Sequence, residues 1–193
     1  RNMLEWAKGI PHVHFIYLST FQVYGKYAGL ITEDTPTEPI NDYGSSHLFA
    51  EILVKQIGKS NGLQYTILRL TNSYGCPLDV HTSKWYLVLN DLSKSAVKDK
   101  KIVLKSNGQA PRDMIWMGTV CEVFQKIVEK KASQDTYNLS GQTTLKMIDV
   151  AQAVKNAYRQ AYGTEIPVTV NLEDKTMYPN DLQVSAQKLQ KFI

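Results

Sequence analysis

The chain of 193 residues has only two cysteines, no long hydrophobic run and no block of charge of one sign. Cys76 and Cys121 lack a CxxC spacing, which argues against a disulfide framework and favours reduced thiols in the cytoplasm. No apolar stretch approaches the roughly 18 residues of a membrane span, so no membrane association is expected. The net charge of +4 is spread along the chain, so nucleic-acid binding is not expected either.

The sequence also lacks the glycine pattern that cradles a phosphate group. Its eleven glycines include no G-x-G-x-x-G cluster, so the phosphate-binding turn of a dinucleotide-binding domain is absent. Gly58-Lys59-Ser60 resembles the end of a P-loop, but Leu53 stands where the first P-loop glycine would be. Histidines and cysteines show no metal-ligand spacing, so no metal site is expected.

Strand-like and helix-like segments alternate along the chain, which predicts an α/β protein with a parallel sheet. Apolar or β-branched runs predict strands at Val13–Leu18, Tyr65–Leu70, Lys101–Leu104, Arg112–Met117, Tyr137–Ser140 and Val168–Leu172. Helical spacing of apolar residues predicts helices at Tyr43–Lys59, Ser83–Val97, Thr119–Lys131, Leu145–Tyr162 and Ser185–Ile193, and residues 25–42 are expected to form a long surface loop.

Two polar clusters carry the chemistry that the sequence offers. Thr20 follows the first predicted strand, and the carboxyl ends of parallel strands are where open α/β sheets bind ligands. Tyr43 and His47 are four residues apart on a predicted helix and therefore share one face. A phenol and an imidazole on one face could form an acid–base pair at a bound ligand.

These segments, in this order, resemble motifs of the extended short-chain dehydrogenase/reductases, in particular the NAD-dependent nucleotide-sugar epimerase/dehydratase family. Thr20 to Gly25 matches [ST]-x-x-V-Y-G, and Tyr43 to His47 matches Tyr-x-x-x-Lys with histidine in place of lysine. Arg69 to Gly75 matches R-x-x-N-x-Y-G, and Arg112-Asp113 begins a strand like R-D-F-I. The ordered match runs from about Val13 to Ile193.

The resemblance implies a partial Rossmann-type parallel sheet, the C-terminal half of that domain, with a small α/β substrate-binding lobe. Residues 1–75 would belong to the Rossmann domain and residues 76–193 mainly to the lobe, with a return to the sheet around residues 112–140. The first half of the Rossmann domain is expected to be missing, so this chain should bind NAD or NADP weakly or not at all. The intact protein is expected to be a cytoplasmic homodimer that acts on a nucleotide-sugar.

The resemblance also assigns roles to individual residues. It implies catalytic roles for Thr20, Tyr43 and His47, and it makes Arg112 a ligand of the substrate's diphosphate. The cofactor would contact Tyr43, His47, Asn72, Ser73 and Tyr74, and the substrate would contact Thr20, Asn72, Lys84, Arg112 and Asp181. Judged from the residues alone, Arg112 could instead pair with Asp113.

Three departures from the family pattern bear on activity. His47 replaces the lysine that holds the nicotinamide ribose and supplies positive charge to the tyrosine, so it is either a ribose contact or a relic. Met117-Gly118-Thr119 stands where V-D-D is usual, and Tyr178 stands where an arginine often precedes the aspartate.

The segment after Thr20 separates the candidate reactions. Phe21 and Gln22 stand where 4,6-dehydratases of this family usually have acidic residues, and neither side chain can transfer a proton usefully. The sequence therefore favours an epimerase or a 4-keto-sugar reductase. The alternatives are a non-catalytic sugar-nucleotide-binding or scaffold protein and, less favoured, a 4,6-dehydratase.

Overall fold

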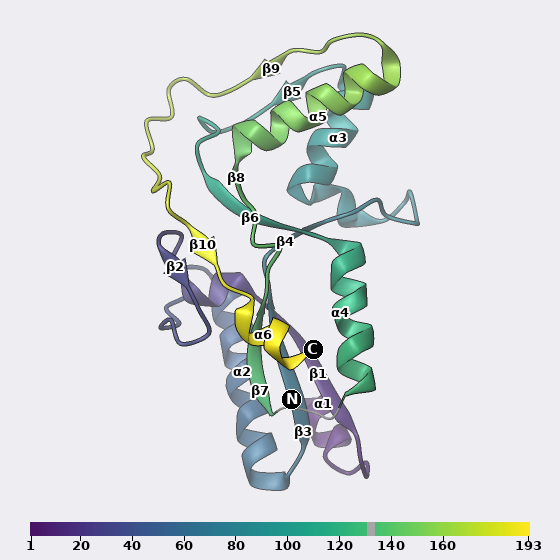
Figure 1. Cartoon of the computed structure of the whole chain (residues 1–193), viewed down its shortest axis with the longest axis vertical. Coiled ribbons are helices and arrows are strands. Elements are labelled where there is room, and N and C mark those ends of the chain that lie inside the picture. Colours follow the sequence, from purple (N-terminus) through teal and green to yellow (C-terminus); the bar gives the residue numbers. More distant parts are fainter. Residues whose placement is uncertain (131–133) are drawn as a thin grey trace.

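The computed structural model describes residues 1–130 and 134–193. The elements form two regions along the long axis, one around strands β1, β3 and β7 and the other around helices α3 and α5 (Figure 1). The helices are α1 (Asn2–Ala7), α2 (Asp42–Asn61), α3 (Val88–Asp99), α4 (Met117–Glu129), α5 (Met147–Tyr162) and α6 (Gln187–Phe192), with short 3-10 helices η1 (Phe21–Tyr24) and η2 (Ser83–Tyr86).

The strands form small sheets, of which the parallel sheet β1-β3-β7 is the centre of the first region. Leu68 of β3 pairs with Leu18 of β1 on one side and with Tyr137 of β7 on the other, so β3 is the middle strand. The strands are β1 (His14–Thr20), β2 (Leu30–Ile31), β3 (Gln64–Leu70), β4 (Asn72–Tyr74), β5 (Ile102–Val103), β6 (Pro111–Trp116), β7 (Asp135–Leu139), β8 (Thr144–Lys146), β9 (Val168–Thr169) and β10 (Gln183–Val184). The predicted parallel sheet is confirmed.

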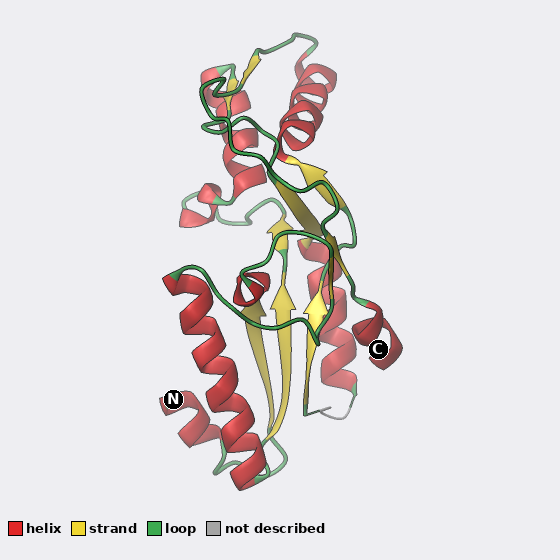
Figure 2. Cartoon of the chain, turned by 90° about the vertical axis from the view of Figure 1, so that its left-hand side faces the viewer, coloured by secondary structure: helices red, strands yellow, loops and turns green. Residues whose placement is uncertain are grey.

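Helices cover both faces of this sheet (Figure 2). On one face α1 and α2 bury an apolar cluster that includes Leu4, Val54 and Ile67. On the other face α4 and α6 pack on the sheet through a cluster that includes Ile127 and Leu189. Burial on both faces explains why the middle strand β3 is largely apolar in the sequence.

The start of α2 is held in place by a cap and by a close contact. Asn41 is the N-cap, and its side chain accepts a hydrogen bond of 2.8 Å from the backbone N–H of Gly44. A Cβ atom at Gly44 would lie 2.7 Å from the backbone oxygen of Gln22, so only glycine lets α2 approach η1 this closely. Tyr43, beside Gly44, is thereby brought to the loop that follows β1.

The second region has a core of its own. Helices α3 and α5 pack together over the short β5-β9 pair, and buried Leu92, Ile102 and Val150 belong to one apolar cluster. Between the two regions, β6 pairs in parallel with β4 and antiparallel with β8. Strand β6 follows β5 of the second region and leads into α4 of the first, so it connects the two regions (Figure 1).

Several predicted boundaries in the second region are wrong. The predicted helix over 83–97 is two elements, η2 and α3, because Leu87 between them has an extended backbone. The predicted helix at Leu145 begins at Met147, since Leu145 pairs with Arg112 in the β6–β8 ladder. The strand predicted to reach Leu172 ends at Thr169.

Elements near the chain ends and loops also differ from the prediction. The last helix spans Gln187–Phe192, and the predicted loop 25–42 contains β2, which pairs with β10. Helix α4 begins at Met117 and ends at Glu129, while the predicted end at Lys131 lies outside the described residues. Helix α1 was not predicted from the sequence.

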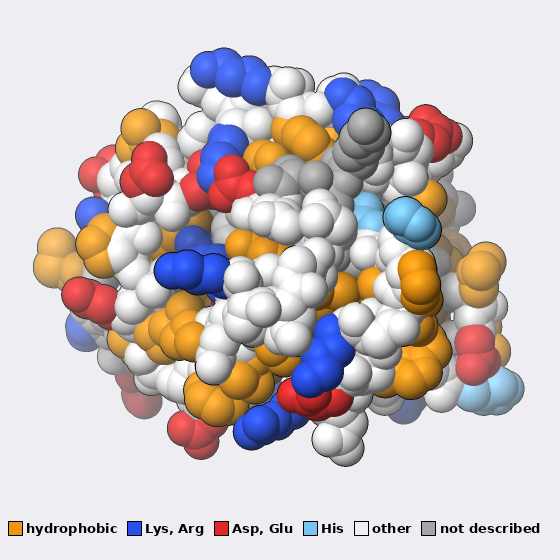
Figure 3. All heavy atoms as spheres, turned by 90° about the horizontal axis from the view of Figure 1, so that it is seen from below, with side chains coloured by type: hydrophobic (Ala, Val, Ile, Leu, Met, Phe, Trp, Pro, Cys, Tyr) orange, Lys and Arg blue, Asp and Glu red, His pale blue; other side chains and the backbone are white. Residues whose placement is uncertain are grey.

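The surface shows the even distribution of charge and the lack of long apolar segments that the composition indicated. On the face seen from below, acidic and basic side chains are interspersed with apolar ones (Figure 3). Within the described part of the chain, no helix is long and apolar enough to cross a membrane.

Candidate active site

A cleft of about 660 Å³ opens at the carboxyl ends of β1 and β3. Its lining joins predicted site residues from four separate segments of the chain: Thr20, Tyr43, Asn72, Ser73 and Arg112. Side chains that the sequence did not single out complete the wall, among them Tyr27, Tyr86 and Leu87. A mixed polar and apolar cleft of this size is typical of a small-molecule site.

Thr20 is buried at the end of β1, where it caps η1. Its Oγ1 accepts a hydrogen bond of 3.3 Å from the backbone N–H of Gln22. Because this contact uses the oxygen as acceptor, the hydroxyl hydrogen is available to donate to a ligand in the cleft.

Tyr43 and His47 occupy successive turns of α2. The Tyr43 side chain is 54% exposed and lines the cleft, whereas His47 is half-buried behind it. Their ring centroids are 4.5 Å apart. The shared helix face predicted from the sequence therefore exists, with the phenol at the cleft and the imidazole one turn further along.

His47 also contacts strand β1. Its Nδ1 lies 2.9 Å from the hydroxyl oxygen of Tyr17. Burial lowers the pKa of His47, and the negative charge of Glu51 opposes that effect only in part. His47 is therefore neutral near pH 7, unlike the lysine that the family pattern places here.

A buried ion pair lies beneath the next turn of α2. Glu51 is fully buried, and its Oε2 is 2.7 Å from Arg69 Nη2, while Ser19 Oγ donates to Glu51 Oε1 at 2.6 Å. The Arg69 guanidinium also lies 4.7 Å from the ring centroid of Tyr24. Since α2, β1 and β3 each contribute one member of this cluster, it fixes the helix that carries Tyr43 to the two strands that form the cleft.

Arg112 and Asp113 are neighbours in β6 with separate surroundings. Asp113 is buried and accepts hydrogen bonds from Thr71 Oγ1 at 2.6 Å and Ser140 Oγ at 3.0 Å. Burial raises the pKa of this carboxyl, and those hydrogen bonds oppose the rise. Arg112 instead donates to the backbone oxygen of Pro111 and lies above Tyr27, and no carboxylate of the described residues pairs with it.

Comparison with known proteins agrees with this arrangement. The model of the NAD dependent epimerase/dehydratase family matches residues 1–140. The chain belongs to this family. The resemblance drawn from the motifs is thereby confirmed.

Relatives with different activities resemble the chain to a similar degree. It is 28% identical to dTDP-glucose 4,6-dehydratase of Xanthomonas campestris pv. campestris, over 78% of this chain and 43% of the relative. It is 27% identical to UDP-glucose 4-epimerase of Lactobacillus helveticus, over 81% of this chain and 51% of the relative. The chain thus spans about half the length of the curated relatives it matches.

Solved structures agree on the fold. A UDP-glucuronic acid 4-epimerase from Bacillus cereus, in complex with UDP-glucuronic acid and NAD, superposes with a TM-score of 0.80 at 22% identity and covers 98% of this chain and 58% of that one. A dTDP-glucose 4,6-dehydratase from Bacillus anthracis with NAD gives 0.77 at 23% identity, covering 98% and 58%. The Rossmann-type α/β fold class is confirmed.

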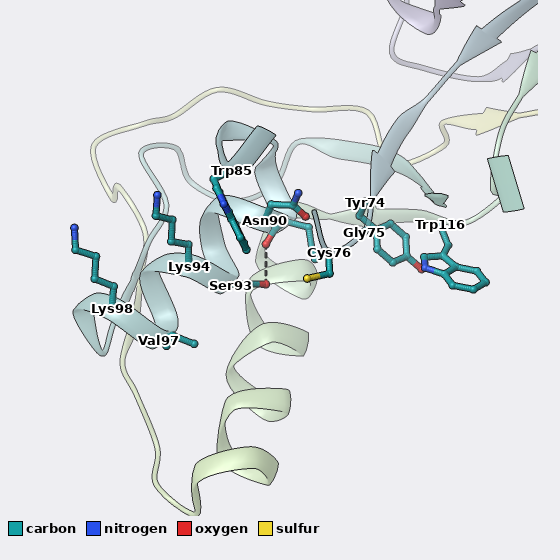
Figure 4. A pocket seen from close by; sticks show the side chains of 11 residues that line it. Tyr74, Gly75, Cys76, Trp85, Asn90, Ser93, Lys94, Val97, Lys98 and Trp116 are labelled. Carbon is teal, nitrogen blue, oxygen red and sulfur yellow. Dashed lines mark hydrogen bonds between the residues drawn. The ribbon is translucent and has the colours of Figure 1, made fainter. Parts of the chain in front are cut away.

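Four predicted site residues of this family member lie outside the cleft lining: His47, described above, and Tyr74, Lys84 and Asp181. Tyr74 lines a second pocket of about 630 Å³, where it lies beside Trp116 (Figure 4). Lys84 is exposed on η2 with its ammonium 5.7 Å from the ring centroid of Tyr86, and Asp181 is exposed beside buried Leu182. Their predicted ligand contacts stay predictions.

The second pocket differs from the cleft in its lining. Apolar and aromatic side chains dominate it, and Lys94 and Lys98 of α3 stand at the side opposite Trp116 (Figure 4). Ser93 lies in the floor, where its hydroxyl donates to the backbone oxygen of Leu89 at 2.8 Å.

Sequence reasoning missed the residues beneath α2. Glu51 follows His47 by four residues and so shares its helix face, which was a usable signal. Tyr17 and Ser19 gave no signal, because their roles depend on which strand α2 covers. Among the described residues, no cluster of histidine, cysteine and carboxylate side chains could hold a metal ion.

Proposed function

We propose that the protein is an NAD(P)-dependent nucleotide-sugar epimerase or 4-keto-sugar reductase. One observation carries the proposal: Thr20 and Tyr43, which come from different elements, line one cleft together with Arg112. A hydroxyl donor, a phenol and an unpaired guanidinium in one cleft suit a sugar that carries a diphosphate.

In this proposal each residue has a separate task. Tyr43 exchanges a proton with a hydroxyl or carbonyl oxygen of the sugar, and Thr20 donates a hydrogen bond to the same oxygen. Arg112 holds the diphosphate with its planar pair of N–H donors. The Asp113 carboxylate accepts hydrogen bonds from Thr71 and Ser140 and does not pair with Arg112. The positive charge of Arg112 can therefore interact with the ligand.

The polar lining of the cleft suits the nicotinamide end of the cofactor. The Nδ2 of Asn72 donates to the backbone oxygen of Asp113 at 3.0 Å, which orients the side chain and leaves its Oδ1 as an acceptor. With Ser73 and Tyr43 it would contact the amide and the ribose. When bound, NAD(P) supplies or accepts the hydride.

The segment after Thr20 favours an epimerase or reductase over a 4,6-dehydratase. Phe21 is buried, and the Oε1 of Gln22 accepts a hydrogen bond of 2.9 Å from Asn41 Nδ2. Neither residue carries an acidic proton, and the described lining of the cleft includes no aspartate or glutamate that could assist loss of water from the sugar.

Turnover by the protein in its natural length tests the proposal. A panel of UDP- and dTDP-sugars with NAD and NADP should give an epimerised or reduced product, followed by chromatography and by absorbance of the reduced cofactor. Tyr43→Phe should lower kcat by about 10²–10⁴-fold, the contribution of one proton-transfer group. Tyr162→Phe, which makes the same change on the exposed end of α5, should leave kcat unchanged.

A non-catalytic sugar-nucleotide-binding protein is the second candidate. The observation that favours it is His47, which is neutral near pH 7 where the family motif has a lysine. Tight binding of a nucleotide-sugar without any turnover in the presence of either cofactor would support it. An accumulating 4-keto-6-deoxy-sugar would instead support a dehydratase.

We also propose that the intact protein is a homodimer. Helices α1 and α2 pack on the same sheet face and expose apolar side chains, among them Trp6, Phe49 and Ile52. Exposed apolar groups on neighbouring helices favour association. Sedimentation of the parent and of Phe49→Lys should give a dimer and a smaller species respectively; a monomeric parent would contradict the proposal.

A further inference from the structure

Tyr17 is a half-buried partner of the site that the family motifs do not include. It lies in β1 beneath α2, three residues before Thr20, and its hydroxyl oxygen is 2.9 Å from His47 Nδ1. Their rings lie 5.9 Å apart and tilted, so the contact joins the strand to the helix that carries Tyr43.

The direction of this hydrogen bond follows from counting protons. Burial raises the pKa of Tyr17, and the charge of Glu51 raises it further, so the phenol keeps its hydrogen. Among the described residues His47 Nδ1 is the one acceptor recorded for that hydrogen. If Nδ1 were itself protonated, two hydrogens would compete for one contact and the half-buried phenol would lose its acceptor.

The groups around His47 support a neutral ring. From its own helix it faces Tyr43 and Glu51, and from β1 it faces Tyr17. The negative charge of Glu51 is compensated by Arg69 at 2.7 Å and, more weakly, by Lys55 at 3.8 Å. The carboxylate therefore has closer partners than the imidazole.

We infer that Tyr17 is a positioning residue: by donating to Nδ1, it holds His47 in the neutral tautomer that carries its hydrogen on Nε2. His47 then offers one N–H donor in place of the charged ammonium of the family's lysine. Resting on the proposed function, that donor serves an oxygen of the cofactor ribose. Tyr17 touches neither substrate nor cofactor and acts through the orientation and tautomer of His47.

Nitrogen NMR of the ¹⁵N-labelled protein tests the tautomer without any turnover. The two ring nitrogens of His47, assigned by their loss in His47→Gln, should report an unprotonated Nδ1 and a protonated Nε2 near pH 8. In Tyr17→Phe the ratio of the Nε2–H to the Nδ1–H form should fall about fivefold, the change that one neutral hydrogen bond gives. A parent with Nδ1 protonated, or an unchanged ratio in Tyr17→Phe, would overturn the inference.

Tyr65→Phe is the matched control for general effects of the substitution. Tyr65 is another tyrosine of the sheet in the apolar cluster beneath α2, and it packs against Gly58 at the other end of the helix. This variant should keep the tautomer of His47, and a change there would mean that the ratio reports packing instead of the Tyr17 hydroxyl.

Kinetics separate this inference from the proposed function. In an active protein Tyr17→Phe should raise KM for the cofactor about fivefold while kcat stays near the parent value. A shifted tautomer with unchanged KM would overturn the ribose contact and leave the tautomer assignment in place. Absence of turnover in the parent would contradict the proposed function alone, because the NMR result does not depend on it.

Discussion

The cleft and the ion-pair cluster beneath α2 lie close together and differ in one property. The charged side chains of the cluster are paired within the protein, whereas the Arg112 guanidinium in the cleft is not paired within the described part of the chain. Beneath α2, the Glu51 carboxylate forms an ion pair with Arg69 and accepts a hydrogen bond from Ser19, so its charge is balanced within the protein. In the cleft, Tyr43 is exposed and Arg112 has no carboxylate partner among the described residues. The buried ion pair joins helix α2 to strand β3, whereas the proposed function gives the Arg112 guanidinium to a ligand.

The largest expected effect comes from removing the buried ion pair. Glu51→Ala leaves the Arg69 guanidinium, which is 4% exposed, without its countercharge. The free energy of unfolding should fall by about 3–5 kcal/mol, as measured by urea denaturation. Glu122→Ala, on the exposed face of α4, should change it by less than about 0.5 kcal/mol. Equal effects of the two substitutions would contradict the structural role of the ion pair.

The second largest effect is expected from removing the Arg112 guanidinium from the cleft. In the protein of natural length, Arg112→Ala should weaken nucleotide-sugar binding by about 1.5–3 kcal/mol, the range for a hydrogen bond to a charged group, and leave cofactor binding alone. Calorimetry measures both affinities. Arg159→Ala, whose parent side chain pairs with Glu165 on the surface, serves as the control. Undiminished affinity for the nucleotide-sugar in Arg112→Ala would remove this residue from the site.

His47 lies on α2 between the cleft and the ion-pair cluster. Replacing it by lysine should restore the residue that the family motif has at this position. His47→Lys introduces a permanent positive charge beside Tyr43, which should move the limb of the rate profile that depends on the tyrosine to lower pH by about 1 unit. His12→Lys, at the opposite end of β1, should leave the profile as it is. A profile that does not move in an active His47→Lys protein would show that this position does not tune Tyr43.

The smallest effect concerns Asp113 beneath the cleft. Since burial raises its pKa in the folded protein, the folded state binds a proton more readily than the unfolded chain. Through this group, stability should decrease as pH rises between the unfolded value, near 3.9, and the higher folded value. Asp113→Asn should remove that contribution, seen as a difference of at most about 1.4 kcal/mol per pH unit between the two unfolding curves. Parallel curves would contradict it.

Local pattern was enough to predict much of this fold. Three predicted strands became β1, β3 and β7, and the middle strand β3 is largely apolar because helices cover both of its faces. Helix α2 was predicted within two residues at each end from its apolar spacing and the Asn61-Gly62 stop. Short strands such as β8 and β10 were missed because their pairing partners, not their composition, make them strands.

The same division holds for the candidate site. By itself the sequence determined that Thr20 ends a strand and that Tyr43 and His47 share a helix face, because both follow from spacing along one element. Only the tertiary structure decided that Arg112 joins Thr20 and Tyr43 in one cleft and that Tyr74 lines a different pocket. It also decided that Tyr17 meets His47, since that contact requires α2 to cover β1. Contacts between distant elements depend on packing, and packing is a property of the whole fold.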